Sequence, residues 1–185
     1  MKRITCILLI LLLLAGCSGQ SDEMDRAMAM RARLLGHAVS FDAVVTADYG
    51  DTVYTFTLAC QADTQGNVTF SVTEPDSIAG ISGQISATGG KLTFDDQALS
   101  FALLADEQLS PVSAPWVLIR SLRSGYLTSC GKEGENLRLS VDDSYADDAL
   151  HLDVWLGEND FPIRGEILWK GRRLLSVGVK NFTFV

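Results

Sequence analysis

Few residues of this chain have the types and the spacing that chemistry requires. Four carboxylates, those of Asp142, Asp143, Asp147 and Asp148, bracket a short turn sequence. Carboxylate oxygens at this density are ligands that Ca²⁺ accepts, but their spacing differs from that of an EF-hand loop. A solvated hairpin tip is the simpler interpretation, so we expect no metal here.

The chain contains two histidines, His37 and His151. His37 follows a predicted helix end, where an imidazole interacts favourably with the negative end of the helix dipole. His151 falls on the polar face of a predicted strand. Neither belongs to a cluster with the spacing of a zinc site, or to a recognisable set of nucleophile, base and acid. We therefore expect no catalytic residue and no cofactor, and a protein that is not an enzyme.

The beginning of the chain has the pattern of an export signal. A short positive start precedes an apolar run at residues 4–14. As a helix, this run spans about 16 Å, which is too short for a bilayer core of about 30 Å. Such a run behind a positive start is typical of a secretory signal peptide. The sequence Leu-Ala-Gly-Cys that follows at residues 14–17 resembles the lipobox of bacterial lipoproteins.

The lipobox resemblance implies a division of the chain into three segments. Residues 1–16 form a signal peptide that is cut between Gly16 and Cys17, and Cys17 carries the lipid. Residues 17–23 form a short flexible tether, and residues 24–185 form the domain. Acyl chains such as palmitate would then hold the protein on the extracytoplasmic face of the cell membrane, because two or more chains give lasting attachment.

Two cysteines remain once Cys6 leaves with the leader and Cys17 carries lipid. These are Cys60 and Cys130. Export permits a disulfide between them. The alternative is a pair of free thiols, with Cys60 buried as a small hydrophobic residue. The sequence leaves both interpretations open.

Composition excludes several classes of protein. The 185 residues are 47% hydrophobic and 21% charged, with 15 Lys+Arg against 23 Asp+Glu and a formal net charge of −8. This hydrophobic content is that of a folded chain rather than a disordered one, and the length suits one domain. Nucleic acid is an unsuitable partner because its binding depends on a basic surface.

Hydrophobic periodicity predicts two helices separated by strands. The first helix covers residues 22–35, with Met24, Ala27, Met28, Leu34 and Leu35 on a face that packs into the core. The second covers residues 110–124. Other segments alternate with a period of two, which is typical of strands that are apolar on one side. These predicted strands cover residues 54–60, 68–73, 81–87, 91–95, 99–104, 137–141, 150–156, 163–169 and 174–184.

These elements predict a mainly β (α+β) fold. We expect one strongly curved antiparallel sheet, an incomplete barrel of about 9–11 strands. Its apolar face must be covered, and the N-terminal and mid-chain helices are the covers available for the concave side.

The order of these elements resembles the lipoprotein-carrier fold of LolA and LolB. It is closer still to lipid-anchored relatives in Gram-positive bacteria, including sporulation and germination lipoproteins such as GerS. The resemblance covers residues 22–185. The pieces that carry it are the sequences at residues 74–81, 110–111, 153–156, 161–162 and 181–182.

The resemblance implies an apolar cavity that holds acyl chains beneath the helices. The candidate lining residues are Tyr54, Phe56, Leu58, Phe70, Val72, Trp116, Ile119, Leu122, Leu152 and Val154. On this interpretation the protein is a lipid-anchored binding protein for an acyl chain or the lipid of a lipoprotein. The alternative is a filled core in a non-enzymatic protein-interaction lipoprotein, which scaffolds or regulates envelope or spore enzymes through a protein partner or as a homodimer.

Overall fold

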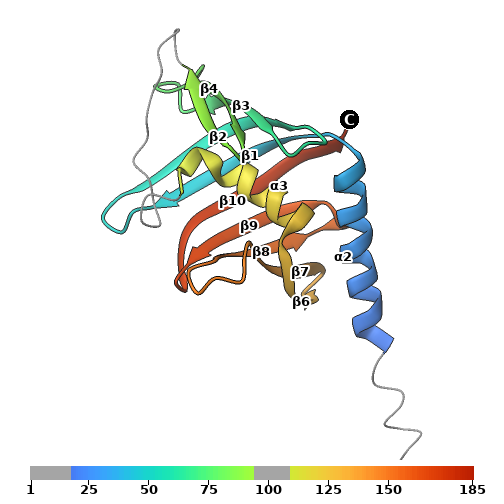
Figure 1. Ribbon diagram of the computed structural model, residues 1–185. Helices are drawn as coiled ribbons and strands as arrows, with labels where there is room; N and C mark the ends of the chain where they lie inside the picture. Colours follow the sequence, from blue (N-terminus) through green and yellow to red (C-terminus); the bar gives the residue numbers. More distant parts are fainter. Residues whose placement is uncertain (1–17, 94–108) are drawn as a thin grey trace, which may run out of the picture.

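In the part of the chain that the structure describes, ten strands form a single antiparallel sheet, which is the body of the protein (Figure 1). The structure is a computed structural model, which describes residues 18–93 and 109–185. The strands are β1 (Val39–Asp48), β2 (Val53–Ala62), β3 (Val68–Glu74), β4 (Ser82–Ser86), β5 (Gly89–Thr93), β6 (Tyr126–Glu133), β7 (Asn136–Asp142), β8 (Leu150–Leu156), β9 (Pro162–Trp169) and β10 (Arg172–Phe184).

The strand order is β5-β4-β3-β2-β1-β10-β9-β8-β7-β6. Every pair joins strands adjacent in the chain except β1 and β10, which join the two halves of the sheet to each other. Strand β1 also pairs with β2, and β10 also pairs with β9. The pairing of β1 with β10 therefore joins the N-terminal and C-terminal halves of the sheet.

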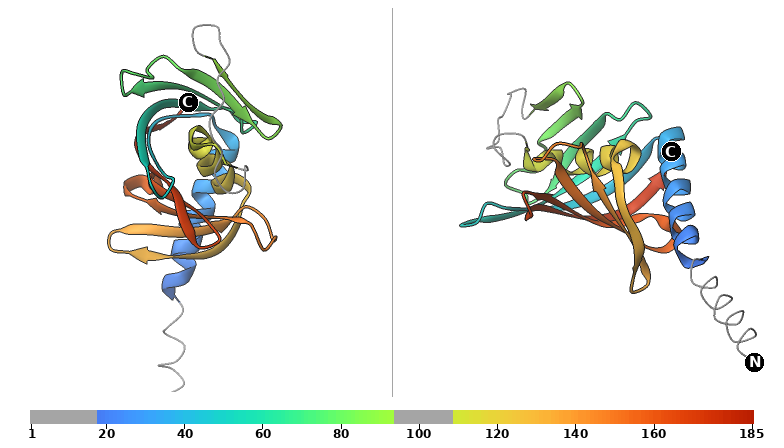
Figure 2. Two further views of the ribbon diagram at one scale, coloured as in Figure 1. Left: turned by 90° about the vertical axis from the view of Figure 1, so that its left-hand side faces the viewer. Right: turned by 60° about the horizontal axis from the view of Figure 1, so that its bottom comes forward.

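The sheet curls so that one face is concave (Figure 2). In β1 the buried and half-buried residues alternate without a break, with Phe41, Ala43 and Val45 on the concave side. This alternation buries one face of the strand in the core. The predicted fold class, one curved antiparallel sheet with two helices, is confirmed.

Two helices lie on the concave side. Helix α2 (Ser18–Gly36) crosses one end of the strands, and α3 (Ala114–Ser124) lies within the curve of the sheet (Figures 1 and 2). The 3-10 turn η1 (Pro111–Ser113) leads into α3, and η2 (Glu158–Asp160) links β8 to β9. Pro115 stands in the first turn of α3, where its missing N–H costs no helical hydrogen bond.

Helix α2 begins earlier than the sequence predicts and turns a different face to the core. It starts at Ser18, so residues 18–23 of the expected flexible tether are helical. Ala27, Met30 and Leu34 are buried, whereas Met24, Met28 and Leu35 are 38%, 50% and 58% exposed. The prediction that Met24, Met28 and Leu35 pack into the core is therefore wrong. The helix has two apolar stripes, and the sequence alone does not say which one the sheet covers.

Two strands have no counterpart among the sequence predictions, namely β1 and the edge strand β6. The other described strands match predicted segments within two residues at most ends. The predicted strand at residues 99–104 and the end of the one at 91–95 lie outside the described residues.

The outer face of β8 also differs from the prediction. His151, Asp153 and Trp155 do share a face opposite Leu152, Val154 and Leu156, but of the three only His151, whose side chain is 37% exposed, is open to water. Asp153 is 5% exposed and Trp155 is 8% exposed. The guanidinium groups of Arg138 and Arg164 lie over the Trp155 ring, with their central carbons 5.4 and 4.6 Å from its centroid.

Candidate functional site: a covered concave face

Most of the predicted cavity residues meet on the concave side of the sheet. Phe56, Leu58, Phe70, Val72, Leu152 and Val154 reach it from the strands, and Ile119 and Leu122 reach it from α3; all are buried in one core. Trp116 is half-buried at its margin. Tyr54 is the exception: it is 57% exposed and packs edge-on against Tyr49 at the start of β2. Its assignment to the cavity is wrong, because it precedes the part of β2 that turns into the core.

The concave face is filled at these positions. Leu58, Ile119, Leu122 and Val154 have 0% exposed surface, and Leu152 has 1%. A side chain that lines a void of water size keeps accessible surface toward that void. Exposure of 0–1% therefore means that no void of water size lies beside these five side chains. In the described part of the chain, the site is a packed contact between helix and sheet.

Helix α2 holds the end of α3 through Arg31. The Nε of Arg31 donates to the carbonyl of Leu122 at 2.7 Å, and its Nη2 donates to those of Ser121, at 3.2 Å, and Gly125. The last carbonyls of a helix have no partner within the helix and carry its partial negative charge. A guanidinium satisfies several of them at once. Burial lowers the pKa of Arg31 below its usual value.

Arg123 of α3 makes the reciprocal contact to the end of α2. Its Nε donates to the carbonyl of Leu34 at 2.9 Å and its Nη2 to that of His37 at 3.2 Å. Its Nη1 reaches the Asp63 carbonyl, at 2.6 Å, in the turn between β2 and β3. Only 9% of Arg123 is exposed, and burial lowers the pKa of its guanidinium. The C-terminal ends of the two helices thus meet. The arginine of each helix neutralises the partial negative charge at the end of the other helix.

We call this pair of contacts, made by Arg31 and Arg123, the helix latch. It fastens the two helices to each other through polar bonds, while their apolar faces contact the sheet. Sequence reasoning missed both residues. The feature of the sequence that could have indicated them is the basic residues near the C-terminal end of each helix, because such side chains can bond the last carbonyls of a helix.

Other contacts hold α2 at the end of the strands. Arg26 donates from Nε and Nη2 to Asp160 of η2, at 2.9 and 2.5 Å. This hydrogen bonding raises the pKa of Arg26. The guanidinium of Arg33 lies 4.2 Å from the ring centroid of Phe184. The Nδ1 of His37 lies 3.0 Å from the carbonyl oxygen of Arg33, which is the predicted position at the negative helix end.

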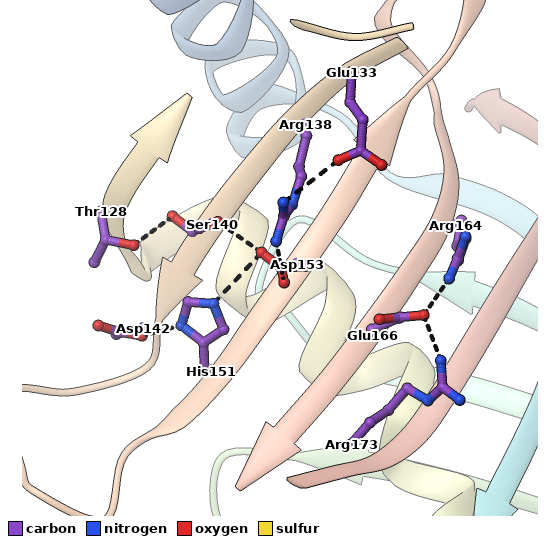
Figure 3. A network of polar contacts seen from close by, with 10 residues as sticks. All are labelled: Thr128, Glu133, Arg138, Ser140, Asp142, His151, Asp153, Arg164, Glu166 and Arg173. Carbon is purple, nitrogen blue, oxygen red and sulfur yellow. Dashed lines mark hydrogen bonds and ion pairs between the residues drawn. The ribbon is translucent and has the colours of Figure 1, made fainter. Parts of the chain in front are cut away.

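The outer face of β6–β10 carries a polar network (Figure 3). Asp153 accepts from Arg138 Nη2 at 2.7 Å and from Ser140 Oγ at 2.6 Å. His151 lies between two carboxylates, with Nδ1 2.6 Å from Asp142 and Nε2 3.4 Å from Asp153. Burial raises the pKa of Asp153, but the bonds from Arg138 and Ser140 and the neighbouring charges outweigh it, so its pKa is lowered.

This network joins side chains of neighbouring strands. The Ser140 hydroxyl donates to the Asp153 carboxylate, which also pairs with Arg138. Glu166 accepts in the same way from Arg164 and Arg173, the latter at 2.9 Å. These contacts join neighbouring strands across the outer face, where side chains of paired strands lie close enough to bond.

A hollow of about 940 Å³ also lies on the outer face, above β10, β1, β2 and β3. Its walls include Asp42, Thr57, Glu74 and Lys180. Asn181 donates to Asp42 at 2.6 Å and Thr57 donates to Glu74 at 3.0 Å. Val44, Pro75 and Phe56, the last of them a predicted cavity residue, line it as well, so the lining mixes polar and apolar groups. Because it lies on the outer face of the sheet, this hollow is not the cavity beneath the helices that the sequence predicts.

Cys60 and Cys130 are separate thiols, so the structure supports the second of the two interpretations of these residues. Cys60 is buried in β2 and Cys130 is half-buried in β6. Within residues 18–93 and 109–185, no group of three or more metal-ligating side chains is positioned to hold an ion. In the same ranges, no helix is both long and apolar enough to span a bilayer. Gly16 and Cys17 lie outside the described residues.

Comparisons with known proteins give similarity at the level of three-dimensional structure only. No family model matches the chain, and no curated protein matches its sequence. The solved structure of an uncharacterized conserved protein from Thermus thermophilus has a TM-score of 0.47 at 14% identity, over 89% of this chain and 86% of that one.

Two further solved structures are similar at the same level. A LolA superfamily protein from Nitrosomonas europaea has a TM-score of 0.43 at 8% identity, over 86% of this chain and 93% of its own. A putative outer membrane lipoprotein-sorting protein domain from Vibrio parahaemolyticus has a TM-score of 0.45 at 10% identity, over 90% and 93%. At these values the likeness identifies no ligand or partner, which must be inferred from the geometry described above.

Proposed function

We propose that this protein is a non-enzymatic, lipid-anchored binding protein on the extracytoplasmic face of a bacterial membrane. Its ligand is an acyl chain, free or as part of a lipoprotein, which enters between the concave face of the sheet and the two helices. Cys17 is the lipidated residue, and cleavage precedes it. A role in sporulation or germination, which the resemblance to GerS implies, stays a prediction.

One observation carries this proposal, namely the way the apolar face is covered. The concave face is closed by two helices whose mutual fastening is the helix latch, a set of hydrogen bonds from Arg31 and Arg123 to carbonyls. Such bonds have a modest net free energy, because water replaces them when they break. In this proposal an acyl chain replaces the apolar contacts that the helices make with the sheet, so that the cover separates from the concave face. The packed interior is then the closed, unliganded arrangement.

The test is the binding of a fluorescent fatty acid to the domain without its anchor. If only the open protein binds the fatty acid, its apparent affinity is the affinity of the open form multiplied by the fraction of protein that is open. We expect weak, saturable binding by the wild type and tighter binding by Arg31→Lys and Arg123→Lys, whose ammonium groups cannot hold several carbonyls in one plane. Arg120→Lys is the matched control, because Arg120 is exposed on α3 and lies outside the latch. Absence of saturable binding in all four proteins would contradict the proposal.

A second candidate function is favoured by the filled interior and by an exposed aromatic pair at one end of the sheet. Strand β6 is a terminal strand, and its first residue, Tyr126, stacks on Tyr145, with ring centroids 3.8 Å apart. Tyr145 is 83% exposed. A terminal strand with exposed aromatic residues is suited to a protein partner or a second copy of the chain. Native mass spectrometry of detergent-free protein separates the two functions: a bound lipid supports the first, and a bare homodimer or protein complex supports the second.

A further inference from the structure

The outward side of α2 carries an apolar stripe that no described element covers. Met24, Met28 and Leu35 are 38%, 50% and 58% exposed, and Ala32, which lies between them, is exposed as well. At about 100° per residue, these four positions fall within an arc of about 80°. We call this set of four residues the outer stripe. It is separate from the buried stripe of Ala27, Met30 and Leu34, which seals the core.

The position of the helix in the chain indicates what lies against the outer stripe. Helix α2 begins at Ser18, directly after the residue that we propose carries the lipid. No flexible linker then separates the acyl chains from the helix. The N-terminal turns of α2 also extend beyond the sheet (Figure 1). An anchor at Cys17 would therefore bring this helix, before any other element, to the surface of the bilayer.

We propose that the outer stripe of α2 rests on the surface of the lipid bilayer, so that the helix lies along the membrane and fixes the orientation of the domain. This inference rests on the proposed lipidation of Cys17. Methionine and leucine side chains on one face of a helix enter the interfacial layer of a membrane, with the polar face toward water.

The contact is weak by itself and becomes effective because of the anchor. Three large side chains and one alanine bury little surface, whereas a stable protein dimer buries about 20–30 residues on each side. The outer stripe is therefore too small to hold a second copy of the chain. A tethered surface binds its second site at a high effective concentration, so a small apolar area is enough once acyl chains hold the helix end in the bilayer.

Charge is consistent with a neutral bilayer surface as the partner. Asp25 is exposed just beside the outer stripe, and Arg31 on its other flank is occupied by the helix latch. The helix thus presents no free basic cluster for anionic head groups along its described residues. We expect the contact to depend on apolar insertion and to form on phosphatidylcholine vesicles without anionic lipid.

The experiment uses the acylated full-length protein with an environment-sensitive NBD label at Met28→Cys, in a Cys130→Ser background. Cys60 stays unlabelled because it is buried, and acylated Cys17 has no free thiol. Ala29→Cys is the matched control: it is the next residue, is exposed, and lies about 100° around the helix. Each labelled protein is reconstituted on phosphatidylcholine vesicles with and without a nitroxide-bearing lipid.

We expect a blue shift and a several-fold rise in NBD emission at position 28 on vesicles, quenched by the nitroxide lipid, with a much smaller response at position 29. Equal responses at 28 and 29 in acylated, vesicle-bound protein would overturn the inference and leave the anchor intact. A mass spectrum without acyl chains, with no vesicle binding, would overturn the anchor and the inference together. A response at 28 that depends on protein concentration without vesicles would assign the stripe to a second copy and overturn the bilayer contact.

Discussion

Buried charges on the outer face of the sheet are individually important for stability. Asp153 is 5% exposed and receives hydrogen bonds from Arg138 and Ser140. Loss of such an acceptor leaves a guanidinium and a hydroxyl without a partner in a poorly hydrated place. The network at Asp153 therefore stabilises the outer face of the sheet, as apolar packing stabilises the concave face.

We expect Asp153→Asn to lower the free energy of unfolding by about 2 kcal/mol at neutral pH, because one hydrogen bond to a charged group is weakened. The folded-state pKa of Asp153 is lowered, so its contribution is present above the unfolded pKa of about 3.9 and is lost as the pH falls through the folded value. Urea unfolding at pH 7 and at pH 3 measures both effects. Asp148→Asn, in an exposed loop, is the control; a pH-independent difference for Asp153→Asn would contradict this account.

The two cysteines differ in accessibility and are not joined. Burial raises the pKa of the Cys60 thiol, and burial followed by the charge of Glu23 raises that of Cys130. In the domain with Cys17→Ser and without residues 1–16, we expect maleimide to modify Cys130 alone in the folded protein. Unfolding without a reductant should give two labels by mass spectrometry. A mass unchanged by labelling after unfolding would show that a disulfide joins the two residues.

At the scale of elements, the junction between α3 and β6 depends on a residue without a side chain. A Cβ at Gly125 would lie 2.4 Å from Val141 Cγ1 and 2.8 Å from the Ser121 carbonyl. The same carbonyl and that of Gly125 accept from Arg31 in the helix latch. Gly125 thus permits the close approach of helix end, strand and arginine that holds the cover in place.

Gly125→Ala should cost about 1–3 kcal/mol of stability, the usual penalty for overpacking a tight site. Gly131→Ala in β6 is the control, because a Cβ there would meet nothing within 4 Å. We expect its effect to remain within about 0.5 kcal/mol. Thermal unfolding of both variants measures the difference. Equal stabilities would contradict the close contacts that the structure gives a Cβ at position 125.

Strands and helices were predictable where apolar residues alternate strongly. Strand β8, at Leu150–Leu156, matches its predicted range, and the turn after β2 forms because Asp63 accepts from the backbone N–H groups of Gln65 and Asn67. Strand β6 was missed because an edge strand buries little and has a polar sequence. Strand β1 was missed because small alanines occupy two of its buried positions. Its place at the centre of the sheet comes from pairing with β10, a long-range contact that no local pattern contains.

The sequence was sufficient to predict which residues lie at the candidate site, but not whether they enclose a cavity. Eight of the ten predicted cavity residues lie in the core, since any residue on the apolar face of the sheet meets the helices there. Whether that face encloses a void depends on how closely α3 approaches it, which is a property of packed volumes. The helix latch was equally invisible, because Arg31 and Arg123 bind backbone carbonyls, and the sequence does not show which helix ends meet.

At the scale of the whole molecule, the anchor determines where the domain acts. We expect Cys17→Ser to move the protein from the membrane fraction to the soluble fraction, because a single helix contact without acyl chains binds reversibly. Immunoblotting of fractionated cells measures the distribution, with the Cys130→Ser protein as the control. Continued retention of the Cys17→Ser protein in membranes would contradict the proposed lipidation.

The central claim is that an acyl chain displaces the helices from the concave face. Photo-crosslinking with a fatty acid that carries a diazirine at its end tests this claim most directly, since mass spectrometry locates the modified residues. The account predicts modification of Leu58, Ile119 and Leu152, which are buried together in the core that α3 covers. Modification confined to exposed residues such as Tyr54 and Met28, with none beneath the helix, would contradict it.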